Sequence, residues 1–341
     1  MSSDWFHRLT GFREDGYAAT RSRLAIDGEH LVSLVDGSRH AIGRFETPTL
    51  AQLRERCAAA PPAGVRTRVT CLVGDARVLH ADPGLAGALF QVASQFNALE
   101  MVSPNVTPED GVTRYAHDRT QGPACAIAAG AATIWRNYFV PLGGHTGQTA
   151  ERQLDLLAGL GTLLAEALGR PVHELWSMRN GYALATADGL RPIGALLRGA
   201  DEARRDRLRA ALAVGWHRDV EVTDAPPGAR PRVSQVFCSA LPVAYTRIAP
   251  PAWEPFARLV LEAAYEATLR AAAGQARAGG SATVLLTRLG GGVFGNADAW
   301  IDDAIERALA LVAGEGLDVR LVSYGQPHTS FEAIAERWSA A

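Results

Sequence analysis

The chain has 341 residues, of which 48% are hydrophobic and 21% are charged, so it can bury a large core and is not disordered. Its formal net charge of −2 argues against a nucleic-acid coat and against a polybasic membrane anchor. All 34 basic residues are arginine, and the absence of lysine excludes a Schiff-base enzyme, a pyridoxal-phosphate enzyme and a Walker A phosphate loop.

The four cysteines lie far apart and fit neither a disulfide framework nor a zinc site. We therefore expect free thiols, no structural metal and a cytoplasmic protein. No apolar signal segment opens the sequence, and the uncharged stretch 121–135 is shorter than the roughly 20 residues of a membrane span. We expect that stretch to lie in a buried helix.

Residues 1–65 are predicted to form a small β-rich unit. Apolar and polar residues alternate over 24–46, and two Asp-Gly dipeptides within that stretch are typical of hairpin turns, which predicts an antiparallel meander. Thr49 and Gln52 have the spacing of a capping box and predict a helix start. The Pro- and Gly-rich segment 60–64 predicts a boundary.

From residue 66 onward, expected strands and helices alternate, which predicts a mostly parallel or mixed sheet with helices on both faces. Strands are expected at 69–73, 88–94, 233–240, 283–289 and 319–324. Helices are expected at 124–139, 149–168, 201–214, 253–273 and 298–313. Asn180-Gly181 predicts a hairpin, and the charged helix at 201–214 is either a solvated face or a docking surface for a protein.

A glycine-rich loop joins the strand at 283–289 to the helix that follows. Its residues are Gly290, Gly291, Gly292, Val293, Phe294, Gly295 and Asn296. Glycines before a helix N-terminus let backbone N–H groups approach an anion, and the helix dipole favours negative charge there. A tight turn without a ligand is the alternative, but the phenylalanine between glycines favours a ligand site with an aromatic wall.

A second polar loop precedes a helix of small residues. Asp118 lies just before the helix start, and Asp110 lies eight residues earlier on the same loop. Two carboxylates beside an anion site suggest acid–base catalysis or guanidinium binding. Aspartates are also common on exposed loops, which is the alternative for each of them. His117, beside Asp118, is a further candidate for the site.

Several of these segments together resemble macrodomains. VGD at 73–75, the strand ending in FNALE at 96–100 and the turn into a small-residue helix resemble the first part of that fold, and VRLVSYG at 319–325 resembles its last strand. GGGVFGN resembles the second macrodomain loop and its poly(ADP-ribose) glycohydrolase counterpart, which cradles the ADP-ribose diphosphate. Among these proteins, the chain is most similar to arginine-specific macrodomain ADP-ribosylhydrolases, some of which are bacterial effectors that act on ubiquitin.

The resemblance covers 66–140 and 232–325, which leaves residues 1–65 as an addition and 145–230 as an insertion into a macrodomain-like domain at 66–341. It implies an α/β/α three-layer sandwich with a mixed sheet. The chain departs from the glycohydrolases at the Gln-Glu-Glu signature, which is absent, and at the first loop, where Thr-Gln-Gly-Pro replaces a glycine-rich turn. These departures set it apart from enzymes that cleave poly(ADP-ribose) chains.

The resemblance implies an enzyme that removes mono-ADP-ribose from arginine side chains by hydrolysing the N-glycosidic bond. Its partner would be an arginine-modified protein, such as a ubiquitin-like one, with ADP-ribose as ligand and product, no separate cofactor, no nucleic acid and no membrane. Asp118 with Asp110 would bind the guanidinium and orient or deprotonate a water.

The resemblance also implies an ADP-ribose site. Asp75 would contact the adenine amino group, Tyr324 would stack near the adenine, and Asn97 would hold the distal ribose. Residues 290–296 would wrap the diphosphate, with Phe294 against the ribose. The remaining contacts implied for the ligand come from Thr120, Gln121 and Gly122.

Two other functions stay open at this point. The domain could be a non-catalytic reader that binds ADP-ribose without cleaving it. A papain-like hydrolase would instead use Cys125 at a helix start, with Gln121 in the oxyanion hole and His145 or His217 as base. Residues 239–242 lie at the end of a predicted strand and are candidates to line the cleft, whichever of these functions the chain has.

Overall fold

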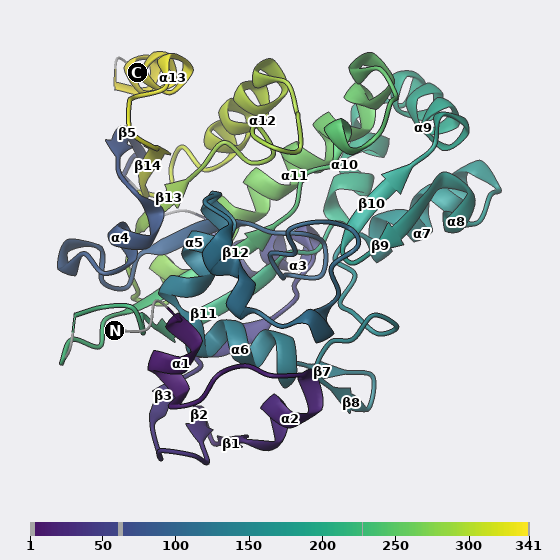
Figure 1. Cartoon of the computed structure of the whole chain (residues 1–341). Coiled ribbons are helices and arrows are strands. Elements are labelled where there is room, and N and C mark those ends of the chain that lie inside the picture. The colour runs from purple at the N-terminus through teal and green to yellow at the C-terminus, as the bar shows by residue number, and fades with distance from the viewer. Residues whose placement is uncertain (1–3, 61–63, 227, 340–341) are drawn as a thin grey trace.

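A seven-stranded mixed sheet forms the centre of the computed structural model, which describes residues 4–60, 64–226 and 228–339 (Figure 1). In spatial order its strands are β4 (Arg44–Glu46), β11 (Gly215–Glu221), β12 (Arg232–Cys238), β6 (Leu89–Ala93), β13 (Thr283–Leu286), β14 (Asp318–Ser323) and β5 (Arg68–Val73). The strands from β12 to β5 pair in parallel, whereas β11 is antiparallel to both of its neighbours. The predicted mixed sheet is confirmed.

Three small antiparallel sheets and a set of helices complete the described fold. The small sheets consist of β1 (Leu24–Asp27), β2 (His30–Ser33) and β3 (Arg39–Ala41), of β7 (Pro141–Leu142) and β8 (His145–Thr146), and of β9 (Trp176–Arg179) and β10 (Tyr182–Ala185). The α-helices are α1 (Trp5–Thr10), α2 (Tyr17–Ser22), α3 (Leu50–Arg56), α4 (Ala76–His80), α5 (Gln121–Ala128), α6 (Gly130–Tyr138), α7 (Ala158–Leu168), α8 (Val172–Leu175), α9 (Ala187–Gly199), α10 (Glu202–Ala210), α11 (Pro250–Arg277), α12 (Asp298–Leu311) and α13 (Thr329–Ser339).

Helices cover both faces of the central sheet. On β6, Gln91 donates a hydrogen bond to Thr268 of α11, whereas the preceding Phe90 stacks on His80 of α4. Successive strand side chains point to opposite faces, so α11 and α4 lie on opposite sides of the sheet. Helix α12 packs against α11, and α5 packs against α4. The expected three-layer α/β/α arrangement is confirmed.

The N-terminal segment has the predicted local structure but also contributes to the central sheet. Strands β1 to β3 form the expected meander, and α3 begins with the Thr49–Gln52 capping box. Strand β4 leaves this meander and pairs with β11. The meander and α13 lie at opposite ends of the molecule (Figure 1). The predicted boundary at 60–64 lies mostly outside the described residues.

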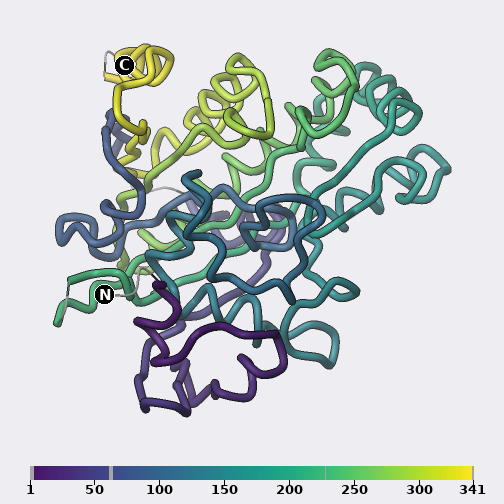
Figure 2. Tube along the Cα trace, in the orientation of Figure 1, coloured from purple at the N-terminus to yellow at the C-terminus, as the bar shows by residue number. Residues whose placement is uncertain are grey.

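The predicted helix at 124–139 is wrong as a single element, because the chain breaks at Ala129, which has φ −110° and ψ 58°. A side chain at Gly130 would lie 2.8 Å from the Trp5 ring, and the Gly130 N–H donates to Thr223. Long-range packing against α1 therefore interrupts a run of helix-forming residues. The N-terminal segment passes along α6 (Figure 2). The Tyr17 hydroxyl donates to the carbonyl of Asn137 in that helix.

Two further expectations differ from the structure in the segment 145–230. The helix expected at 149–168 begins only at α7, because Thr149 pairs with Arg152 and the Leu156 N–H donates to Phe96. Strand β11 was not predicted, although it lies between β4 and β12 in the central sheet. Helices α1, α2, α4, α8, α9 and α13 were not predicted either. Of the helices described, none is long and apolar enough to cross a membrane.

Candidate functional site

A cleft of about 410 Å³ lies where β6, β12, β13 and β14 end. Ligands of open α/β sheets bind at the carboxyl ends of the strands, so this is the expected place for a site. The predicted residues that line it are Asp118, Thr120, Gln121, Gly122, Gly290, Gly292, Val293, Phe294 and Tyr324. The two loops singled out in the sequence therefore meet at one cleft.

Tertiary contacts fix the conformation of the glycine loop. Gly290 has φ +73°, and a side chain there would overlap the Cβ of Ala240. Asn296 donates to the carbonyls of Leu241, at 2.9 Å, and of Gly290, at 3.3 Å, and so holds the two ends of the turn together. Asn296 thus supports the loop from within the fold and does not line the cleft.

Three consecutive amides of this loop are available to a ligand. The N–H groups of Gly292, Val293 and Phe294 donate to no acceptor in the described part of the chain. All three residues line the cleft, and Gly292 and Val293 are exposed. Successive free N–H groups in a turn form a concavity that binds anions.

The second loop places a carboxylate at the cleft. Asp118 Oδ1 accepts hydrogen bonds from the N–H and the hydroxyl of Thr120, at 2.8 and 2.7 Å. The Gln121 side chain bonds to the backbone of Ala93 and Gln91, which ties the start of α5 to β6. At Gly122 a side chain would overlap the carbonyl oxygen of Ala93, so the close contact requires glycine.

Asp110, the other predicted catalytic aspartate, does not line the cleft. Its carboxylate accepts from the N–H of Thr107 at 2.8 Å and lies 3.8 Å from the Arg114 guanidinium. It therefore stabilises a short 3-10 turn at Pro108–Asp110. His117 is exposed and does not line the cleft either.

Four other residues predicted to contact the ligand lie outside the lining of the cleft: Asp75, Asn97, Gly291 and Gly295. Asp75 caps α4 by accepting from the N–H of Arg77. Asn97 is fully buried and bonds to Gln153 and to the N–H of Leu99. Of residues 239–242, only Ala240 lines the cleft.

An aromatic cluster forms one wall of the cleft, and the sequence analysis predicted Phe294 of this cluster but missed its two tyrosines. The rings of Tyr182, Tyr245 and Phe294 lie 5.1 to 5.5 Å apart, centroid to centroid, and all three residues line the cleft. The Tyr182 hydroxyl donates to the carbonyl of Met101, and burial raises the pKa of that phenol. Tyr182 directly follows the Asn180-Gly181 turn, so the predicted hairpin was the one sequence signal that pointed to this residue. Tyr324 is 82% exposed at the rim.

Glu100 is a second acidic residue at the cleft that the sequence analysis did not select. Its side chain is buried, and neither carboxyl oxygen has a hydrogen-bond partner in the described structure. Burial raises the pKa of Glu100 to about 8, and Arg136, at 3.7 Å, only partly opposes this. Its position after β6 gave no sequence signal, because burial of a single glutamate is decided by tertiary packing.

The cysteine-hydrolase alternative is not supported by the position of its nucleophile. Cys125 is fully buried, and burial raises the pKa of its thiol well above the usual range. Burial likewise lowers the pKa of His217 well below its usual value, while His145 is exposed in β8. Within the described ranges, no group of three His, Cys, Asp or Glu side chains is placed to hold a metal ion.

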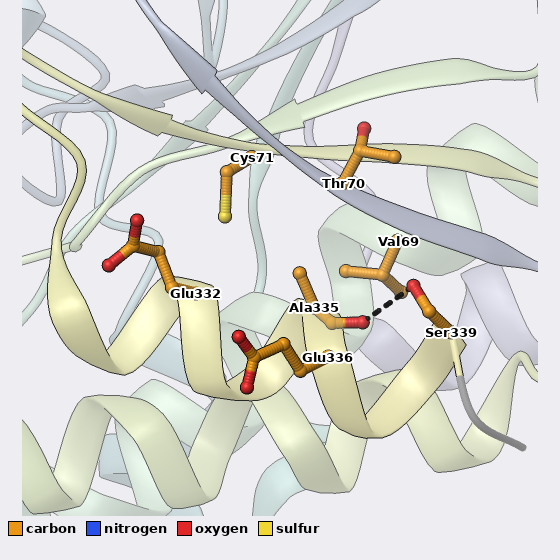
Figure 3. A pocket seen from close by; sticks show the side chains of 7 residues that line it. All are labelled: Val69, Thr70, Cys71, Glu332, Ala335, Glu336 and Ser339. Carbon is orange, nitrogen blue, oxygen red and sulfur yellow. Dashed lines mark hydrogen bonds between the residues drawn. The ribbon is translucent and has the colours of Figure 1, made fainter.

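A second hollow, of about 570 Å³, lies between β5 and α13 and is lined by Cys71 and two glutamates, Glu332 and Glu336 (Figure 3). Its charged lining is acidic only, which does not suit a diphosphate. Partial burial raises the pKa of the Cys71 thiol, and the two carboxylates raise it further. This thiol is therefore a poor nucleophile at neutral pH.

We expect a thiol reagent to modify Cys71 faster than the other three cysteines of the native protein, because the reagent can reach it. Cys71 is exposed, whereas Cys57, Cys125 and Cys238 are buried. A colorimetric disulfide reagent should titrate about one thiol before denaturation and four afterwards, faster at pH 9 than at pH 7. The Cys71→Ser variant should lose the fast phase. Rapid modification of a second thiol would contradict the buried positions.

No protein-family model and no curated protein matches the chain. Solved structures of bacterial poly(ADP-ribose) glycohydrolases do. The enzyme from Thermomonospora curvata is 15% identical, with 94% of this chain and 97% of that chain covered and a TM-score of 0.46. The Deinococcus radiodurans enzyme in complex with ADP-ribose is 15% identical, with 96% and 98% covered and a TM-score of 0.45. The T. curvata enzyme bound to the inhibitor ADP-HPD is 14% identical, with 94% and 97% covered and a TM-score of 0.44.

Proposed function

We propose that the cleft binds ADP-ribose and that the chain hydrolyses the N-glycosidic bond between ADP-ribose and an arginine side chain. The observation that carries this proposal is the pairing, in one cleft, of the free N–H groups of Gly292 to Phe294 with the carboxylate of Asp118. The free N–H groups suit a diphosphate, and the carboxylate suits a cationic leaving group.

The charge of the cleft supports an anionic ligand beside the glycine loop. Two arginines line the cleft. Arg288 is bonded to Asp298 and Asp302, so its charge is compensated. Arg119 is exposed, and no acidic partner is found for it within the described residues. A diphosphate in the cleft would thus have a cation and backbone donors available to it.

The aromatic cluster supports arginine as the linkage. A guanidinium is planar and stacks on aromatic faces, while its N–H groups match a carboxylate. Tyr182 and Tyr245 border the same cleft as Asp118, and the charge of Asp118 contributes to the raised pKa of Tyr182. One Asp118 oxygen is occupied by Thr120, which holds the carboxylate in place and leaves the other oxygen for the substrate.

The chemistry follows from this placement. As the C–N bond breaks, positive charge develops on the ribose in an oxocarbenium-like transition state. The Asp118 carboxylate stabilises that charge and orients or deprotonates the attacking water. Asp110 lies outside the lining of the cleft, so Asp118 alone of the two predicted aspartates takes this role.

The test is a release assay on proteins that carry mono-ADP-ribose on arginine, serine or aspartate and glutamate, with ADP-ribose binding measured by calorimetry. We expect micromolar or tighter binding and release from arginine only, because only arginine offers a guanidinium to the cleft. Binding without release from any linkage would make the protein a reader. Neither binding nor release would overturn the proposal.

A further inference from the structure

Glu100 carries a buried carboxyl group at the wall of the cleft. Its side chain is 1% exposed, and both of its oxygens lack a hydrogen-bond partner. The separation of 3.7 Å from the Arg136 guanidinium is too long for a hydrogen bond. A buried carboxylate that accepts no hydrogen bond and faces one cation at 3.7 Å is poorly compensated, which favours its neutral form or a ligand that supplies the missing hydrogen bond.

One cation and two other titratable groups surround the Glu100 carboxyl. The titratable groups near it are Arg136 from α6, Tyr115 from the 3-10 helix Thr113–His117 and Cys125 from α5. The Glu100 N–H donates to the Tyr115 hydroxyl at 3.2 Å. Burial raises the pKa of both the tyrosine and the cysteine, so Arg136 is the single cation in this set.

Two backbone features bring Glu100 to the cleft. Ala98 has a φ of 57°, rare for a residue with a side chain, and its carbonyl accepts from Arg136. Glu100 Cγ lies 3.1 Å from the position that a side-chain carbon on Gly122 would occupy. The Glu100 side chain therefore packs directly on Gly122, at the start of α5, and both residues line the cleft.

On the basis of the hydrolase function proposed above, we propose that Glu100 is the general acid of the reaction and protonates the leaving group. Asp118 and Glu100 would then be two carboxyl groups of one site with different environments and different roles. Asp118 is partly exposed and hydrogen-bonded, whereas Glu100 is buried and its carboxyl oxygens accept no hydrogen bond. Burial raises the pKa of Glu100 to about 8, which favours the protonated form at neutral pH.

The proton and electron balance is complete with these two groups and one water. The C–N bond breaks, its electron pair stays on the guanidine nitrogen, and Glu100 donates a proton to that nitrogen. Water forms the new C–O bond at the anomeric carbon, and its proton goes to the Asp118 carboxylate. Proton exchange with solvent then restores Glu100 to its acid form and Asp118 to its carboxylate.

The experiment compares wild type, Glu100→Gln and a control, Glu109→Gln, on two substrates. Glu109 lies on the same loop, bonds to the N–H of Ala150 and does not line the cleft. One substrate is an arginine-linked ADP-ribosyl peptide, whose leaving group needs a proton. The other is 4-nitrophenyl ADP-ribose, whose leaving group departs as a stable anion. ADP-ribose affinity and the pH dependence of kcat/KM are measured in parallel.

We expect Glu100→Gln to slow arginine release at least ~100-fold but to slow nitrophenyl release less than ~5-fold, with the ADP-ribose Kd unchanged. Wild-type kcat/KM on the arginine substrate should fall above about pH 8, and this fall should be missing in Glu100→Gln. Equal loss on both substrates, or no loss, would overturn the acid role while leaving the hydrolase intact. Wild type without binding or release would overturn the proposed function and this inference together.

Discussion

Asp118→Asn should abolish most release of ADP-ribose from arginine while leaving ADP-ribose binding almost unchanged. The amide keeps the size of the carboxylate and can still accept from Thr120, so the loop should hold its conformation. It lacks the charge that stabilises the oxocarbenium ion and removes a proton from water. We expect kcat to fall by roughly 10²- to 10⁴-fold, measured as single-turnover release from an arginine-modified protein.

Asp110→Asn is the matched control for that variant. Asp110 lies on the same loop and carries the same charge, but its carboxylate caps Thr107 and does not line the cleft. The Asp110→Asn variant should release ADP-ribose at a rate within about threefold of wild type, since the substitution removes no group from the cleft. Comparable losses in the two variants would mean that Asp110 reaches the substrate, and would restore the pair expected from the sequence.

Gly122→Ala should destabilise the protein, because the added methyl group meets backbone on the other side of the contact. The new carbon would overlap the carbonyl oxygen of Ala93, and neither atom belongs to a flexible side chain. Either α5 or the end of β6 has to shift. Overpacking against backbone costs about 3 kcal/mol, which outweighs the gain of about 1 kcal/mol that alanine normally brings to a helix. Thermal unfolding should show a Tm lower by about 3 °C.

Gly199→Ala provides the control for this substitution. Gly199 ends α9, no heavy atom lies within 4 Å of the added carbon, and its φ is not positive. This variant should unfold at the wild-type temperature or slightly above it. ADP-ribose binding should be weakened in Gly122→Ala alone, because only that change distorts the cleft. An unchanged Tm in Gly122→Ala would show that α5 and β6 are not in close contact.

Local chemistry made several elements predictable from the sequence. The capping box at Thr49 and Gln52, the Asn180-Gly181 turn and the alternation of strands with helices all depend on residues within a few positions of one another. The glycine loop and the Asp118 loop were predicted for the same reason, because residues adjacent in the sequence determine their turns. These signals were sufficient for the fold class and for most of the central strands.

Tertiary contacts decided the rest. The break between α5 and α6 depends on Trp5, more than a hundred residues away, and β11 is a strand because it pairs with β4 and β12. Tyr182 and Tyr245 lie at the cleft only because segments distant in the sequence fold against it, and Glu100 is buried there because α5 and α6 pack over it. The sequence by itself determined which residue types were available for the chemistry. Burial raises the pKa of Glu100, because desolvation depends on what surrounds a group in space and not on its neighbours in the chain.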